Sequence, residues 1–88
     1  MKLKENFVLR EVADTWVVLP LGEATLDFNG MLSLNESGAM LWRVLEHGGN
    51  RQALLDALTA EYDVAQDEAQ ADVESFLQKL RQAGCLAE

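Results

Sequence analysis

The sequence contains few of the residues on which most enzyme and metal sites depend. Its 88 residues include one histidine, His47, and one cysteine, Cys85. Nucleophilic catalysis usually pairs a Ser, Cys or Thr with a positioned histidine base. The chain has no Cys-x-x-Cys motif, no pair of histidines, no EF-hand loop and no Gly-rich phosphate loop. The sequence therefore predicts a protein that is not an enzyme and that holds no metal or cofactor.

The single histidine and the single cysteine both have a structural interpretation. His47 directly precedes Gly48-Gly49, where a helix is expected to end and a cation suits the carbonyl end of the helix dipole. Cys85 precedes Leu86 near the C-terminus, a position typical of a small buried hydrophobe. A lone cysteine forms no internal disulfide, which agrees with a reducing compartment.

Long hydrophobic runs are also missing. A membrane-spanning helix needs about 20 consecutive apolar residues, and no run of the sequence approaches that length. The first residues, MKLKENFVLR, lack the apolar segment and the small-residue cleavage site of a signal peptide. We therefore expect a cytoplasmic protein that does not interact with a membrane.

Positive charge is scarce. Seven Lys and Arg residues stand against fifteen Asp and Glu residues, for a formal net charge of -8. Such a field repels a phosphate backbone, so the sequence predicts no nucleic-acid partner. Residues 61–74 carry no basic residue but several acidic ones, namely Glu61, Asp63, Asp67, Glu68, Asp72 and Glu74. An acidic stretch of this kind is usually a solvated helix face, and otherwise it attracts a basic partner.

The sequence does have the composition of one compact domain spanning residues 1–88. It is 49% hydrophobic and 25% charged, within the ordinary globular range. Strand-forming runs at residues 7–12 and 15–19 are separated by Ala13-Asp14, which predicts a hairpin with a tight turn. The alternation in these runs is imperfect, so it does not show which face of the strands is buried or whether Trp16 lies on that face.

A second hairpin is predicted just before the helical part of the chain. Residues 25–28 continue the strand pattern, and Asn29-Gly30 tolerates the positive φ angles of a type I′ turn. Residues 31–34 would then be the return strand. The expected strands therefore lie between about residues 7 and 34.

Helical periodicity begins after Asn35, a favourable N-cap residue. It predicts three helices, at about residues 36–47, 51–62 and 67–83, with Asn50 capping the second and Gly84 following the third. Trp42 and Phe76 lie on apolar helical stripes and are expected in the core. Short strands followed by helices predict an α+β fold, in which a small antiparallel sheet of N-terminal strands packs on three C-terminal helices.

Three segments, in this order, resemble PqqD-like proteins, the RiPP precursor-peptide recognition elements. The run LNESGAMLW at residues 34–42 resembles their strand-to-helix junction. Residues 54–64 resemble their second helix, and residues 72–86 resemble their third helix with its closing Gly-x-Leu. The resemblance implies a winged-helix-like fold with a three-stranded sheet on three helices, and it covers nearly the whole chain.

The resemblance also implies a non-catalytic adaptor that binds the leader segment of a precursor peptide. The leader would add an antiparallel strand to the third strand, and its side chains would contact the third helix. An exposed strand edge offers main-chain hydrogen bonds for such binding, while a groove beside it reads side chains. By position, the expected strand contacts are Phe28, Met31, Leu32, Ser33 and Leu34, and the expected helix contacts are Asp72, Phe76, Lys79 and Arg81.

The partner implied besides the leader is a modifying enzyme, and the family resemblance suggests a radical SAM enzyme acting in trans. An acidic groove wall would in addition prefer a leader that bears Lys or Arg. The residues leave open which strand edge is free, because the stretch from Leu21 to Gly30 is longer than the hairpin of the family. Two alternatives are a structural module that forms a homodimer through a strand edge and a winged-helix DNA-binding regulator, which the net charge of -8 disfavours.

Overall fold

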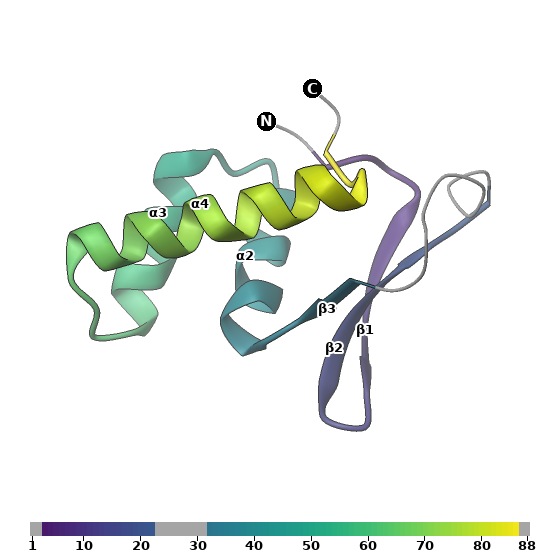
Figure 1. The fold of residues 1–88 in the computed structure, drawn as a ribbon, viewed down its shortest axis with the longest axis horizontal. Coiled ribbons are helices and arrows are strands. Elements are labelled where there is room, and N and C mark those ends of the chain that lie inside the picture. The colour runs from purple at the N-terminus through teal and green to yellow at the C-terminus, as the bar shows by residue number, and fades with distance from the viewer. Residues whose placement is uncertain (1–2, 23–31, 87–88) are drawn as a thin grey trace.

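The computed structural model describes residues 3–22 and 32–86 of the chain. Three strands precede three helices, in the order β1 (Phe7–Val12), β2 (Thr15–Pro20), β3 (Leu32–Leu34), α2 (Glu36–Glu46), α3 (Arg51–Glu61) and α4 (Gln66–Ala83). Figure 1 shows the sheet extending from one side of the group of helices. The predicted α+β fold is therefore confirmed. The predicted strand at residues 25–28, the Asn29-Gly30 turn and the start of the return strand lie outside the described residues.

The first hairpin turns through two residues, as its sequence predicts. Ala13 and Asp14 have φ angles of 50° and 67°, and the flanking residues Val12 and Thr15 are paired. Two consecutive left-handed residues are typical of a type I′ turn, whose twist matches that of the two strands. β1 and β2 are therefore held in antiparallel register along their whole length.

β3 lies at one edge of the sheet. The strand order is β1-β2-β3, and β3 pairs antiparallel with β2 so that Trp16 lies opposite Leu34. Among the described residues, no strand pairs with the other side of β3. β3 is thus the edge strand of the described sheet, at the point where the chain enters α2.

Two asparagines begin the first two helices, as predicted. The Asn35 Oδ1 atom accepts a hydrogen bond of 2.8 Å from the backbone N–H of Gly38. The Asn50 Oδ1 atom accepts one of 2.9 Å from Ala53. Each side chain therefore satisfies one of the free N–H groups of a helical first turn.

The remaining helix ends also follow from local chemistry. The Nδ1 atom of His47 lies 2.7 Å from the Arg43 carbonyl oxygen, so His47 caps the end of α2 as expected. α4 begins at Gln66 without a side-chain cap. It ends at Gly84, whose φ of 79° places it in the left-handed region. Each helix differs from its predicted range by one residue, at one end.

The core is formed mainly among the three helices, and Phe7, Val18 and Leu34 of the sheet join it. α3 packs against both α2 and α4, and Leu3 forms a β-bridge with Leu86, which joins the two ends of the described chain. The predicted core positions Trp42, Phe76 and Cys85 are buried. None of the helices in the described ranges is long and apolar enough to cross a membrane.

Candidate functional site

A groove begins at the end of β3 and continues along α4. We call it the β3–α4 groove; it has a volume of about 190 Å³ and is lined by Leu34, Asn35, Ser37, Gly38, Leu41, Leu58, Asp72, Ser75, Phe76 and Lys79. Buried Leu34, Leu41 and Phe76 contribute its apolar part. The polar residues are exposed or half-buried. The accessible surface of the groove is therefore mainly polar, with a small apolar floor.

The α4 side of the groove is one helical stripe. Asp72, Ser75, Phe76 and Lys79 are spaced at i, i+3, i+4 and i+7, the spacing of residues that share a helix face. Phe76 is 7% exposed and points into the core, whereas Asp72, Ser75 and Lys79 are exposed. The stripe thus combines one aromatic residue that anchors the helix with three positions accessible to a ligand.

The β3 side of the groove depends on a close approach between Gly38 and the preceding residues. A Cβ atom at Gly38 would lie 3.1 Å from Asn35 Oδ1 and 3.3 Å from Leu34 Cβ. These distances are shorter than most side-chain contacts, so a larger residue would displace the cap or the end of β3. Gly38 of the LNESGAMLW run therefore allows Leu34 and Asn35 to keep their positions at the groove.

The charges in the groove are balanced. Among the described residues that line it, Asp72 is the one carboxylate and Lys79 the one ammonium. The expectation of an acidic groove wall is therefore wrong. The acidic stretch of the sequence is divided among several surfaces, because Glu74 forms an ion pair with Arg51 and Glu61 lines a different hollow.

The structure places most of the predicted site residues together. Leu32, Ser33 and Leu34 form the edge strand, and Leu34, Asp72, Phe76 and Lys79 line the groove. Arg81 is not among the lining residues, because two residues beyond Lys79 the helix has turned by about 200°. Phe28 and Met31 lie outside the described residues.

Several groove residues were not predicted. Ser75 shares the stripe of Asp72 and Lys79, so helical periodicity could have identified it. Asn35, Ser37 and Gly38 were singled out for the helix cap and the family motif, but not for ligand contact. Leu41 and Leu58 follow apolar stripes, and the sequence contains no signal that distinguishes their contact with the groove from ordinary core packing.

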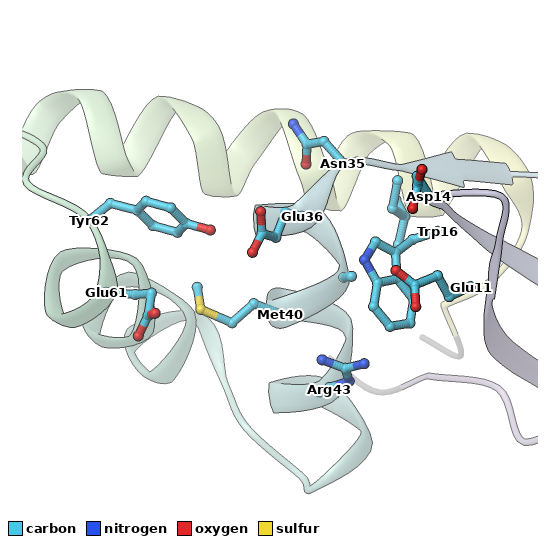
Figure 2. A pocket seen from close by; sticks show the side chains of 11 residues that line it. Glu11, Asp14, Trp16, Asn35, Glu36, Met40, Arg43, Glu61 and Tyr62 are labelled. Carbon is cyan, nitrogen blue, oxygen red and sulfur yellow. The ribbon is translucent and has the colours of Figure 1, made fainter.

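A larger hollow lies on the other side of the Leu34–Asn35 junction. We call it the hairpin hollow; it has a volume of about 540 Å³ and lies between the tip of the β1–β2 hairpin, α2 and the end of α3. Figure 2 shows Trp16, Met40 and Tyr62 reaching toward it from these three elements. The guanidinium carbon of Arg43 lies 4.5 Å from the centre of the Trp16 ring. Trp16, whose burial could not be predicted, is thus a half-buried wall of this hollow.

The titratable groups of the described residues do not assemble into a reactive centre. Burial raises the pKa of the Cys85 thiol from 9.0 to about 11, with an opposing and smaller influence from the positive charge of Lys4. A thiol with a raised pKa is a poor nucleophile at neutral pH. Within residues 3–22 and 32–86, no three His, Cys, Asp or Glu residues are grouped so that they could hold a metal ion.

The three strands, the three helices and the groove beside an edge strand define a small α+β domain suited to binding an extended peptide. Residues 15–86 match the family described as Coenzyme PQQ synthesis protein D (PqqD). The match covers most of the chain. This protein therefore belongs to the PqqD family.

Two solved structures have the same fold. TbiB1 in complex with the TbiA(beta) leader peptide is 26% identical, with a TM-score of 0.78 and 100% of both chains covered. Lasso peptide synthetase B1 complexed with the leader peptide is 21% identical, with a TM-score of 0.77 over 99% of this chain and 96% of that one. No curated protein matches the chain.

Proposed function

We propose that this protein is a non-catalytic recognition element that binds the leader segment of a ribosomally made precursor peptide and presents it to a modifying enzyme. The observation that carries the proposal is the edge strand β3, which ends at a groove lined by α4. Membership of the PqqD family supports it. So does the likeness to TbiB1, which was solved with a leader peptide bound.

The proposed binding mode is strand addition. The leader would pair with the outer edge of Leu32–Leu34 as a fourth strand, because an edge strand has unpaired N–H and C=O groups. Side chains of an added strand point alternately to the two faces of the sheet. One apolar side chain of the leader would therefore enter the groove beside Leu34 and Phe76, and polar groups would meet Asp72 and Lys79.

β3 is a better candidate for this edge than β1, which lies at the opposite edge of the described sheet. Among the described residues, the groove with its α4 stripe is lined by Leu34 of β3 and by no residue of β1. Both the main-chain contact and the side-chain contact can therefore form at β3. Self-pairing through the same edge is the competing use of this strand.

The modifying enzyme is the less defined part of the proposal. The resemblance to PqqD-like proteins suggests a radical SAM enzyme acting in trans, whereas one structural relative is a lasso peptide synthetase protein. The proposed binding of the leader to β3 and α4 is the same whichever of these enzymes modifies the precursor.

The test is a titration of labelled synthetic leader segments, made for each short peptide found to be encoded near this gene, into the wild-type protein and two variants. Ser75→Arg fills the groove from an exposed position, and Gln78→Arg adds the same side chain on another face of α4. We expect Ser75→Arg to weaken binding by about tenfold, which is about 1.4 kcal/mol. Gln78→Arg should bind like the wild type.

Hydrogen exchange adds a direct test of strand addition. Saturating leader should slow amide exchange in Leu32–Leu34 and leave β1 unchanged, because only the β3 edge gains hydrogen bonds. Equal weakening by both arginine variants, or a leader that does not bind saturably, would refute the proposal. If light scattering showed a leader-insensitive dimer with β3 already protected, self-association would be the function of this edge.

A further inference from the structure

The hairpin hollow is separate from the β3–α4 groove and has a different chemistry. The two share only Leu34 and Asn35. A leader that pairs with β3 and contacts α4 therefore leaves most of the hollow uncovered. Its floor is partly apolar, since Trp16, Met40 and Tyr62 are half-buried.

The rim of the hollow carries an excess of negative charge. Figure 2 shows Glu11 and Asp14 of the hairpin, Glu36 of α2 and Glu61 of α3 around the hollow. Arg43 is the one basic residue among the described residues of the lining, which therefore has a formal net charge of -3. Within the described part of the chain, none of the four carboxylates forms an ion pair.

Arg43 offsets one of these four charges, but within the described residues it forms no ion pair with the rim and lies instead against one wall of the hollow. Its guanidinium stacks on the Trp16 ring, with 4.5 Å between its central carbon and the ring centre. Such a cation–π contact keeps the charge on the aromatic face. The carboxylates thus remain available to a cation from outside the chain.

The surface extends beyond the hollow. A second hollow of about 470 Å³ runs along α2 to the turn after it and shares Met40 and Arg43 with the first; Val44 and Gly49 also line it. This α2 hollow is more apolar than the first. Together the two hollows follow the exposed face of α2, which favours a segment of polypeptide over a single ion or a small molecule.

We propose that the hairpin hollow and the α2 hollow together dock a basic segment of a partner protein. Its Lys or Arg head groups would meet Glu11, Glu36 and Glu61, and its aliphatic stems and apolar residues would pack on Met40 and Tyr62. Long cationic side chains bury their stems on apolar surface while the charge stays at the rim. This inference rests on the proposed function, under which the partner is the modifying enzyme. The enzyme and the leader would then bind one molecule of this protein at the same time, on separate surfaces.

The test uses the full chain, isotopically labelled, and the peptide acetyl-Lys-Leu-Arg-Lys-amide as probe. We expect saturable NMR shifts of the Trp16 indole N–H and of the amides of Met40 and Tyr62, with none along α4. The peptide acetyl-Glu-Leu-Glu-Glu-amide should produce no such shifts. The same titration with Ser75→Arg should be unchanged, so that a failed leader proposal and a failed docking proposal give different results.

A matched pair of variants separates local from overall charge. The triple variant Glu11→Gln, Glu36→Gln, Glu61→Gln removes three carboxylates from the hollow. The control Glu5→Gln, Asp63→Asn, Glu68→Gln removes three exposed carboxylates elsewhere, and Glu68, like Glu36, lies in a helical first turn.

The hollow variant should bind the basic peptide about fivefold more weakly, since three exposed charge pairs contribute about 1 kcal/mol in total. The control should bind nearly as the wild type does. Equal weakening in both variants, shifts confined to the β3–α4 groove, or no shift at about 10 mM peptide would overturn the proposal.

Discussion

The N-cap of α2 provides a test that connects helix stability with leader binding. Asn35→Ala removes the acceptor of the 2.8 Å hydrogen bond from Gly38. It also removes the acceptor of a 3.0 Å bond from the Ser37 hydroxyl, which is exposed and can bond to water instead. Loss of one N-cap side chain costs about 1 kcal/mol. For a domain of this size, that corresponds to a melting temperature lower by about 4 to 8 °C.

Asn50→Ala is the matched control. Asn50 caps α3 through one hydrogen bond of 2.9 Å to Ala53, in the same extended backbone conformation as Asn35. Its loss should lower the melting temperature, measured by circular dichroism, by a similar amount. Asn50 is not among the residues that line the β3–α4 groove, whereas Asn35 is.

The two variants should therefore differ in leader binding and agree in stability. At a temperature where both are folded, Asn35→Ala should bind the labelled leader several-fold more weakly than the wild type, because the end of β3 loses its fixed position. Asn50→Ala should bind with unchanged affinity. A melting temperature unaffected by Asn35→Ala would refute the capping argument, and equal loss of binding in both variants would refute the assignment of Asn35 to the groove.

Three further perturbations test single features of the fold. Burial raises the pKa of Cys85 from 9.0 to about 11, so the unfolded chain loses its thiol proton at a lower pH than the folded chain does. The free energy of unfolding, measured with urea, should therefore fall as the pH rises between these values. The variant Cys85→Ala should not show this fall. Arg43→Met keeps the aliphatic stem but loses the contact with Trp16, and it should lower stability by about 0.5 kcal/mol in the same assay. Gly84→Ala places a Cβ at a φ of 79° and should cost about 1 to 2 kcal/mol; an unchanged melting temperature would contradict this.

Local interactions were sufficient to predict the strands and helices that the structure describes. Asn35 and Asn50 cap helices through bonds to residues three positions away, and Ala13-Asp14 turns the hairpin within two residues. Such contacts depend on neighbours in the sequence, so a residue-by-residue reading identifies them. The family motif at residues 34–42 adds the strand-to-helix junction, where the lack of a Cβ atom at Gly38 permits its close approach to Leu34 and Asn35.

The composition of each surface depended on how the elements pack. Leu34 and Asp72 are far apart in the sequence and line one groove, while Glu11, Glu36 and Glu61 come from three elements and line one hollow. An acidic groove wall was expected, but the α4 stripe that lines the groove carries both Asp72 and Lys79, and packing directs Glu61 of the acidic stretch to the hollow. The charge and the burial of a site depend on all the elements that the core brings together. The periodicity of one element does not show what the others contribute.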